Sequence, residues 1–215
     1  MIDNPDKVLQ VDPHFPDADT IERAASCIRD GGLVVFPTHA FYGLAAKALD
    51  PHAVEAVFRA KQRDPAKPVL ILISTLSEMT ELARSVPDKA VTLIRAFWPG
   101  GVTLVFDGVA GLPVGVTGPS GKIGIRIPGH PVAAALVRAV GQPVTGTSAN
   151  LSGHDPAART EALEAAMLEH VDVVLNAGTL AGGKGSTVVD VTEGGVKILR
   201  PGRISLAMIL TALNG

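Results

Sequence analysis

The stretch VVFPTHAFYGLAAKALDPHAVEAVFRAKQR, residues 34–63, decides the fold class of this chain. It begins with an apolar run that stops at Pro37, passes through a Thr-His pair and a Tyr-Gly pair that predicts a turn, and ends in a helix that delivers Lys61 and Arg63. A strand that ends in small and polar residues and is followed by a helix is how α/β proteins build a ligand site. The stretch therefore predicts an α/β protein with a site at the end of this strand.

The predicted helix runs from residue 50 to residue 61. Asp50 is suited to cap its N-terminus, and Pro51 suits the first helical position, where a missing N–H costs nothing. Apolar residues at helical spacing give the helix one inward face. Lys61 lies at the edge of that face near the helix end, where a cation can bind a ligand or simply complement the helix dipole. These residues alone leave both interpretations open.

The rest of the chain alternates between the same two patterns. Short apolar runs bounded by turn residues predict strands at 33–36, 69–73, 102–106, 123–127, 171–175, 187–191 and 197–199, with another short strand led by Val144. Helical periodicity predicts helices at 19–30, 78–84, 88–98, 131–140 and 160–170, and a last one from its cap Ser205 to Leu213. The segment 107–122, rich in Gly and Pro, predicts a loop. We expect one α/β domain over residues 1–215, with a twisted, mixed parallel and antiparallel sheet and helices on both faces.

Composition narrows the classes of function. The chain has 19 Lys and Arg against 21 Asp and Glu, so affinity for a polyanion must come from a local cluster. One Trp and one Tyr give little support to a stacking platform for single-stranded nucleic acid. The single cysteine, Cys27, excludes an internal disulfide. The N-terminal residues lack the features of a signal peptide and no apolar run is long enough to span a bilayer, so we expect a cytoplasmic protein without membrane contact.

Polar side chains gather where predicted strands and helices end. Thr38 follows the first strand, Lys61 and Arg63 end the helix, and Ser186 follows a glycine-rich loop. The others are Arg126 within a strand, Arg200 after one, and the run Thr147-Ser148-Ala149-Asn150. Such ends converge on one crevice in an open α/β sheet. Several cations beside small hydroxyl and amide groups are what a triphosphate or an adenylate requires, because charge must be neutralised and geometry fixed.

The glycine-rich loop from Gly178 to Lys184 matches the pattern G-x-x-x-x-G-K. A phosphate-binding P-loop continues with Ser or Thr at the start of a helix, so that the helix N-terminus holds the phosphates. Here Gly185 intervenes and the following residues, STVVDV, predict a strand. We therefore expect a flexible loop that accommodates an anion and not a P-loop.

Metal and nucleophile chemistry receive little support. The six histidines show no pairing at helical spacing, so no metal site is predicted. Ser148 lacks the G-x-S-x-G elbow of the α/β hydrolases, so a hydrolase is not expected.

Seven stretches together resemble one family. In chain order they are FPTHAFYGL, KQR, WPGGVT, IGIRIPGHP, TSANLSG, STVVD and ILRPG. Each is weak alone, but seven in order are specific. The chain resembles the YrdC-like family of threonylcarbamoyl-adenylate synthases, most clearly over residues 31–203. The resemblance implies synthesis of L-threonylcarbamoyl-AMP from L-threonine, bicarbonate and ATP, with Mg²⁺ accompanying ATP and release of pyrophosphate. The product serves N6-threonylcarbamoyladenosine modification of tRNA, and the implied partners are tRNA and the proteins that transfer the threonylcarbamoyl group.

The resemblance also implies roles for particular residues. The family's K-x-R and S-x-N motifs fall on four residues that would be catalytic and would bind the ATP phosphates: Lys61, Arg63, Ser148 and Asn150. Lys122 and Arg200 match further nucleotide contacts. Three positions match contacts to threonine and its carbamate: Thr38, Arg126 and Ser186. The resemblance is to the single-domain type of the family.

Two departures from the family pattern stand out. His39-Ala40 follows Pro37-Thr38 where the family reads P-T-E-T, and Gly101 replaces the proline before the threonine of the W-P-G motif. An imidazole in place of a carboxylate changes the charge and the number of acceptors. Because His39 could alter amino-acid choice or mark a paralogue, the alternative is an RNA-binding or regulatory protein that keeps the basic crevice without synthase activity. The family's link to double-stranded RNA binding favours that alternative, whereas the complete Ser148 and Asn150 pair favours the enzyme.

Overall fold

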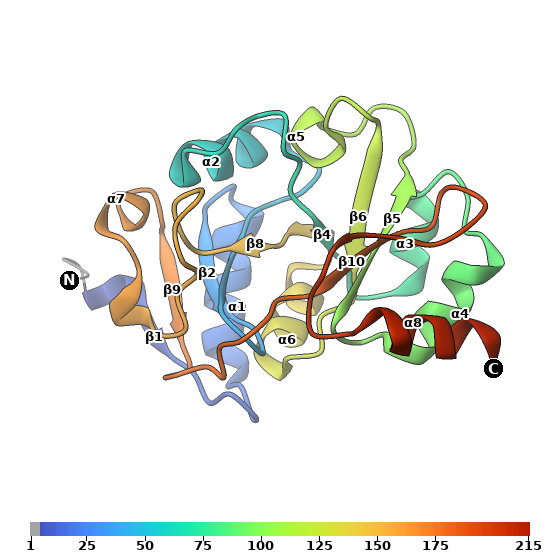
Figure 1. The fold of residues 1–215 in the computed structure, drawn as a ribbon. Coiled ribbons are helices and arrows are strands. Elements are labelled where there is room, and N and C mark those ends of the chain that lie inside the picture. Colours follow the sequence, from blue (N-terminus) through green and yellow to red (C-terminus); the bar gives the residue numbers. More distant parts are fainter. Residues whose placement is uncertain (1–4) are drawn as a thin grey trace.

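The computed structural model describes residues 5–215, and Figure 1 shows their arrangement. The strands are β1 (Val8–Gln10), β2 (Val34–Pro37), β3 (Tyr42–Ala45), β4 (Ile71–Leu72), β5 (Val102–Asp107), β6 (Lys122–Arg126), β7 (Val144–Thr145), β8 (Thr147–Ser148), β9 (Val173–Asn176), β10 (Thr187–Asp190) and β11 (Lys197–Arg200). The α-helices are α1 (Ala18–Arg29), α2 (Pro51–Lys61), α3 (Leu76–Leu82), α4 (Asp88–Phe97), α5 (Val114–Thr117), α6 (Pro131–Val140), α7 (Ala165–Leu168) and α8 (Leu206–Asn214). Two 3₁₀ turns, η1 (Pro5–Lys7) and η2 (Thr160–Ala162), complete the elements.

The strands form two mixed sheets. One has the order β1-β9-β2-β3-β8, and the other has the order β11-β10-β5-β6-β4-β7. Parallel pairs, such as β10 with β5, occur beside antiparallel pairs, such as β2 with β3. The expected α/β class with mixed pairing is confirmed, and the strands that we expected in one sheet are divided between two.

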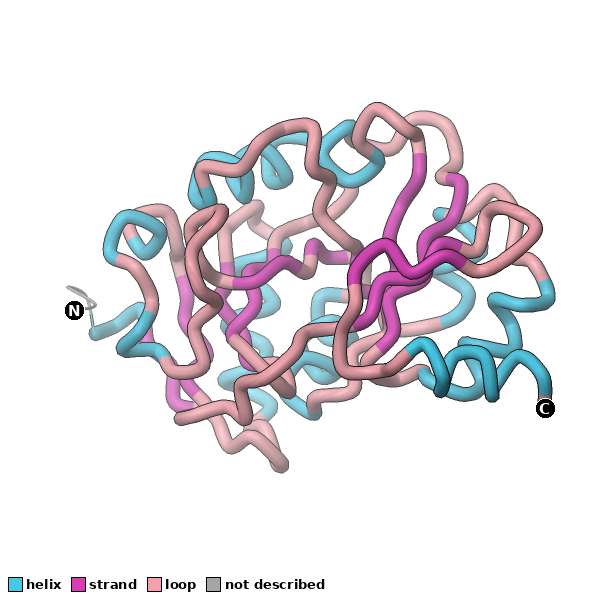
Figure 2. The backbone as a smooth tube through the Cα atoms, in the orientation of Figure 1, coloured by secondary structure: helices cyan, strands magenta, loops and turns pink. Residues whose placement is uncertain are grey.

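Helices cover the sheets as Figures 1 and 2 show. Helices α1 and α6 pack against each other beside β2, and α4 packs against α8 at the other end of the molecule. None of the helices in residues 5–215 combines the length and the apolar character that crossing a bilayer requires. Buried side chains from α1, α6 and β2 form one apolar core, while α2, α4 and β5 contribute to a larger one. The larger core includes side chains from both sheets, such as Leu44 of β3 and Leu104 of β5.

Helix α2 ends at a residue in the left-handed conformation. Asp50 caps its N-terminus through the backbone N–H groups of His52 and Ala53, as the sequence predicts. Gln62 has φ of 47°, a conformation that non-glycine residues seldom adopt. The reversal at Gln62 brings the N–H of Arg63 to the carbonyl of Phe58, at 3.0 Å. The chain therefore turns sharply between Lys61 and Arg63, so that the two cations take different paths.

Two expected elements differ from the structure. Tyr42-Gly43, predicted as a turn, belongs to strand β3, because Tyr42 pairs with Pro37 and Gly43 pairs with Phe36. The helix predicted at 160–170 is instead the turn η2 followed by the four-residue helix α7. Glu164 has extended backbone angles there, and its carboxylate accepts a hydrogen bond from the N–H of Leu151. This contact with a distant loop overrides the helical periodicity.

A shorter helix falls within a predicted loop. Residues 107–122 contain α5, and Gly115 of α5 packs directly on the side chains of Val54 and Phe58 from α2. The remaining strands and helices agree with the prediction apart from shifts at their ends and the short strand β1.

We predict that Gly202→Ala destabilises the fold. A Cβ at this position would lie well inside contact distance of the backbone of Gly185, Ser186 and Thr187, which cannot move away as a side chain could. The free energy of unfolding should fall by about 3 kcal/mol. The control is Gly195→Ala, where an added Cβ meets no heavy atom within 4 Å. Chemical denaturation checks both variants, and equal midpoints for the two would contradict the close approach of these backbones.

Candidate functional site

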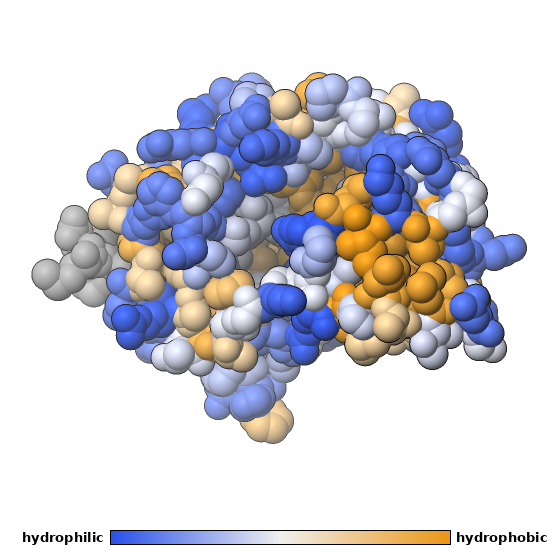
Figure 3. All heavy atoms as spheres, in the orientation of Figure 1, coloured by the Kyte–Doolittle hydropathy of each residue, from blue (hydrophilic) through white to orange (hydrophobic). Residues whose placement is uncertain are grey.

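A cavity of about 550 Å³ is lined by residues of both sheets. Strands β2, β3 and β8 contribute from one sheet, and β5, β6, β10 and β11 contribute from the other. Figure 3 shows this face hollowed near its centre, with hydrophilic residues around the hollow. The segment that follows β9 runs across this face to reach β10 (Figure 1). The crevice expected from the ends of the strands is therefore present.

The charge of the cavity wall is entirely positive. Five lining residues are cationic: Arg63, Lys122, Arg126, Lys184 and Arg200. No Asp or Glu is among the residues that line the cavity. Apolar residues such as Phe36, Phe41 and Val69 make up another part of the wall. A cavity with this lining suits a ligand that carries several negative charges together with an apolar or aromatic group.

Arg126 is the most exceptional of these cations. It ends β6, and its guanidinium makes no hydrogen bond or ion pair with any residue from 5 to 215. Its Nε atom is buried without a partner. Burial, followed by the charges of Arg200 and Arg203, lowers the pKa of Arg126 to about 10. The group remains charged at neutral pH, so the cavity holds a half-buried cation without a protein partner in residues 5–215, and an anionic ligand can pair with it.

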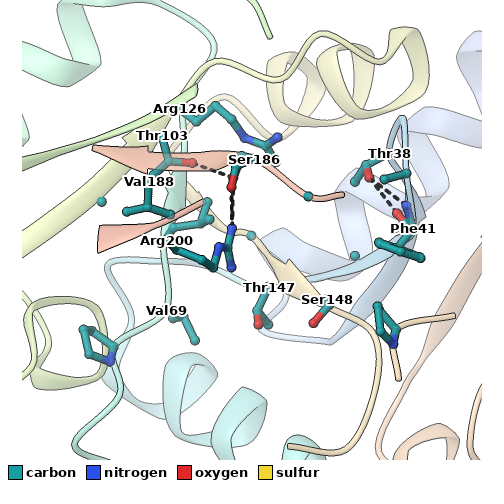
Figure 4. A pocket seen from close by; sticks show the side chains of 18 of the residues that line it. Thr38, Phe41, Val69, Thr103, Arg126, Thr147, Ser148, Ser186, Val188 and Arg200 are labelled. Carbon is teal, nitrogen blue, oxygen red and sulfur yellow. Dashed lines mark hydrogen bonds between the residues drawn. The ribbon is translucent and has the colours of Figure 1, made fainter. Parts of the chain in front are cut away.

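Arg200 is already engaged in a chain of hydrogen bonds (Figure 4). Its guanidinium donates to the carbonyl oxygen of Ser186 at 3.0 Å and to the Ser186 hydroxyl at 3.1 Å. That hydroxyl lies 2.9 Å from the hydroxyl of Thr103, a residue of β5. Arg126 lies on the opposite side of Ser186 from Arg200 in Figure 4. Ser186 is thus held between two arginines, with its orientation fixed by Thr103 and Arg200.

Thr38 lies across the cavity from this group. Its hydroxyl donates to the carbonyl oxygen of Phe41 at 2.6 Å, which closes the tight connection between β2 and β3. The hydroxyl oxygen keeps accepting capacity, and Thr38 lines the cavity as expected. The threonine and carbamate residues predicted from the family pattern, Thr38, Arg126 and Ser186, all line the same cavity.

Arg63 reaches the cavity wall and is fixed by the turn that follows it. Its Nε donates to the carbonyl of Lys67 at 2.7 Å, and its Nη2 donates to the carbonyl of Pro68 at 3.1 Å. Burial and the charge of Arg200 lower the pKa of Arg63. Ser148, at the end of β8, lines the cavity nearby, in agreement with its predicted place. Arg63, Ser148 and Arg200 therefore have positions from which they can contact a phosphate group.

Lys61 and Asn150 do not line the cavity. We expected Lys61 at the edge of the crevice, but its side chain is buried and its ammonium donates to the carbonyls of Ser148 and Asn150, at 2.5 and 2.6 Å. Burial, followed by the charge of Arg63, lowers the pKa of Lys61 to about 8. The Asn150 amide donates to the carbonyls of Leu151 and His154, both at 2.8 Å. The expected position at the crevice edge was wrong because the helix edge is covered by the loop after β8.

Lys122 lines the cavity but is paired. Its ammonium lies 2.9 Å from a carboxylate oxygen of Asp190, and this hydrogen bond is the main cause that raises its pKa. The nucleotide contact of Lys122 stays a prediction, and its positive charge is already partly compensated by Asp190.

The two departures from the family pattern meet at Arg203. Its aliphatic carbons lie over Gly101, where an added Cβ would come within 2.7 Å of Arg203 Cδ. His39 is exposed and does not line the cavity, and its ring lies against that of His130 with centroids 5.6 Å apart. Burial, then Arg203 and Arg126, lower the pKa of His39. Gly101 therefore leaves the space that the side chain of Arg203 occupies, and the nearby cations disfavour protonation of His39.

Some lining residues were missed or left aside by the sequence analysis. Thr103 stands inside an apolar strand pattern, and its place as the last residue of the WPGGVT stretch was a signal that the sequence analysis did not use. Lys184, the last residue of the G-x-x-x-x-G-K segment, lines the cavity, and the next residues lead into β10 as a strand and not a helix. Within residues 5–215 no group of three or more His, Cys, Asp or Glu could hold a metal ion.

We predict that His130 makes the protein less stable in acid. Burial, then His39 and His14, lower its pKa to about 4, against about 6.5 in an unfolded chain. As the pH falls from 6.5 to 4, the unfolded state binds a proton that the folded state excludes, so stability is lost over this window. Allowing for partial solvent screening, the loss due to His130 should be about 1–2 kcal/mol.

The test of His130 compares wild type with His130→Asn by denaturation between pH 4 and 7. Carboxylates also titrate in this range, so the difference between the two proteins isolates the imidazole. A smaller acid loss in the variant is expected. The same pH dependence in both proteins would contradict a buried neutral His130.

The amino-acid sequence is similar to those of known proteins. The sequence model Sua5_yciO_yrdC, described as telomere recombination, matches residues 26–202. A putative threonylcarbamoyl-AMP synthase of Mycobacterium tuberculosis is 40% identical over 194 residues, which cover 90% of this chain and 89% of that protein. The threonylcarbamoyl-AMP synthase of Pyrococcus abyssi is 35% identical over 189 residues, 88% of this chain and 56% of that longer protein.

Solved structures agree with these sequence matches. Pyrococcus abyssi Sua5, crystallised in complex with L-threonine, superposes with a TM-score of 0.88 and 33% identity, covering 95% of this chain and 60% of that one. YciO from E. coli superposes with a TM-score of 0.82 and 29% identity, covering 91% of this chain and 95% of that one.

Proposed function

Because the chain belongs to the Sua5/YciO/YrdC family, we propose that it synthesises L-threonylcarbamoyl-AMP from L-threonine, bicarbonate and ATP and releases pyrophosphate. The observation that carries the proposal is the cavity lining, with five cations and no carboxylate. Such a wall supports binding of a triphosphate beside a second small anion. The product would serve N6-threonylcarbamoyladenosine modification of tRNA, in which tRNA and the proteins that transfer the threonylcarbamoyl group would be the partners.

In the proposed reaction the protein mainly positions the substrates and stabilises negative charge. The amine of threonine adds to carbon dioxide derived from bicarbonate and gives a carbamate. A carbamate oxygen then attacks the α-phosphorus of ATP, and pyrophosphate leaves. Negative charge builds on the leaving pyrophosphate as its bond to the α-phosphorus breaks, so fixed cations that stabilise this charge lower the barrier. Holding the carbamate in line with the leaving group supplies the rest.

The cations and hydroxyls can be assigned to the two substrates. We assign Arg126 to an anionic group of threonine or its carbamate, because its Nε atom is buried and its guanidinium has no partner in residues 5–215. Ser186 and Thr38, on either side of the cavity, would orient the same substrate. Arg63, Ser148 and Arg200 would contact the nucleotide. The apolar part of the wall is available for the adenine ring.

Magnesium would enter with ATP, because Mg²⁺ in nucleotide sites is held largely by phosphate oxygens and water. The hydroxyl of Ser148 faces the cavity and could add one protein oxygen. The ion would supply charge neutralisation of the phosphates. Lys61 and Asn150 act on this site through Ser148 and its loop, since neither lines the cavity.

The experiment is an incubation of the purified protein with ATP, MgCl₂, bicarbonate and L-threonine. We expect pyrophosphate release that requires threonine, with L-threonylcarbamoyl-AMP detected by mass spectrometry. In Arg126→Lys the value of kcat/KM for threonine should fall by roughly 10- to 100-fold, since a charge-assisted contact is lost, while the KM for ATP changes less. The matched control is Arg23→Lys, at an exposed position of helix α1.

A protein that releases no pyrophosphate under these conditions would contradict the synthase proposal. The RNA-binding alternative would then be tested by titration with double-stranded RNA. Unchanged threonine kinetics in Arg126→Lys would contradict the assignment of Arg126 alone.

A further inference from the structure

The loop Ser148–His154 separates the cavity from the end of α2. Ser148 at its start lines the cavity, whereas Asn150 turns inward. The loop is closed upon itself, because the Asn150 amide donates to carbonyls of the loop and the N–H of His154 donates to the carbonyl of Leu151 at 3.1 Å. The Oδ1 of Asn150 is buried and has no hydrogen-bond partner in residues 5–215. The position of Ser148 therefore depends on how this loop is held.

Lys61 holds the loop from the side of α2. Its ammonium binds the carbonyls of Ser148 and Asn150, and its own carbonyl accepts the N–H of Ser152 at 2.8 Å. Three contacts from one residue thus fix the loop to the end of the helix at Ser148, Asn150 and Ser152. A nearby negative charge lowers the free-energy cost of keeping a buried ammonium protonated.

Glu164 holds the same loop from the other side. One carboxylate oxygen accepts the N–H of Leu151 at 2.9 Å, and the other lies 2.7 Å from Nδ1 of His154. Glu164 occupies the N-cap position of α7, yet its side chain makes no capping hydrogen bond to that helix. Its carboxylate contacts the loop and does not cap the N-terminus of α7, although an acidic side chain at an N-cap ordinarily stabilises the helix.

The charges of Glu164 and Lys61 act on each other through the loop. The carboxylate of Glu164 raises the pKa of Lys61, against the lowering by burial and by Arg63. Lys61 in turn lowers the pKa of Glu164, after larger contributions from the Leu151 N–H and His154. The loop is therefore held between a cation and an anion that belong to different elements.

We propose that Glu164 is a positioning residue for the nucleotide end of the cavity: with Lys61 it clamps the loop Ser148–His154 so that Ser148 faces the bound phosphates. This inference rests on the proposed function for its kinetic consequences, but the clamp itself is a property of the free protein. Glu164 touches no substrate. It acts through the backbone of the loop and through the charge of Lys61.

The test uses Glu164→Gln, which keeps an oxygen for the Leu151 N–H but removes the charge, and Glu164→Ala, which removes both. The control is Glu169→Gln, an exposed position in the same segment. We expect kcat of Glu164→Gln to fall roughly tenfold, with a smaller change in the threonine KM and a folded protein. As the pH rises, the activity of Glu164→Gln should also decline at a lower pH than that of wild type. The reason is that loss of the carboxylate lowers the pKa of Lys61 further, so its ammonium deprotonates earlier.

A second measurement does not depend on catalysis. Titration of the Lys61 side chain, followed by NMR of the free full-length proteins, should give a lower pKa in Glu164→Gln than in wild type and in Glu169→Gln. If wild type makes no adenylate but this shift is found, the proposed function fails and the clamp stands. An unchanged Lys61 titration in Glu164→Gln would overturn the clamp. So would a loss of activity that merely follows the fraction of unfolded protein.

Discussion

The rest of the site depends on the half-buried guanidinium of Arg126, whose Nε atom is fully buried. A charged group that loses part of its contact with water destabilises the protein unless it is paired, and residues 5–215 give this one no partner. The neighbouring charges of Arg200 and Arg203 increase that cost, as the lowered pKa of Arg126 shows. The fold can carry the cost because its two apolar cores are extensive. An anion in the cavity would remove the cost, and this is the physical basis for the anionic ligand that we propose.

The two sheets make that arrangement of charge possible. Arg126 comes from β6 and Arg200 from β11, strands of the second sheet, while Thr38 and Ser148 follow or end strands of the first. Because the lining comes from both sheets, each substrate can contact groups from different parts of the chain. The hydroxyl groups of Thr103 and Ser186 fix the direction of Arg200 before any ligand arrives. Such preorganisation is how a site avoids reorganisation costs during a reaction.

The sequence could predict which residues gather, but not which of them face the cavity. Strand ends and the family pattern together place Thr38, Arg63, Ser148 and Ser186 correctly, because these positions follow from topology. Lys61 could not be placed in this way. Its burial depends on the loop after β8 and on the left-handed turn at Gln62, and neither leaves a periodic signal in the sequence.

The same limitation explains the errors in secondary structure. The pattern at 160–170 is helical, but the carboxylate of Glu164 accepts a hydrogen bond from a loop more than ten residues away. The helix is interrupted there. Glycine is a typical turn residue, yet Gly43 is needed in β3 because an added Cβ would lie within 2.8 Å of the Phe36 ring. The departures at His39 and Gly101 could be seen in the sequence, whereas their common neighbour Arg203 required the structure. Long-range contacts decided each of these cases.

We propose that Arg126 binds an anionic group of threonine or its carbamate, and that Arg63 and Arg200 bind phosphates. A crystal structure of the protein with L-threonine and a non-hydrolysable ATP analogue tests it most directly. The account predicts a carboxylate or carbamate oxygen within about 3 Å of the Arg126 guanidinium, and phosphate oxygens against Arg63 and Arg200. Both ligands bound with Arg126 still unpaired, or the phosphates bound outside this cavity, would contradict it.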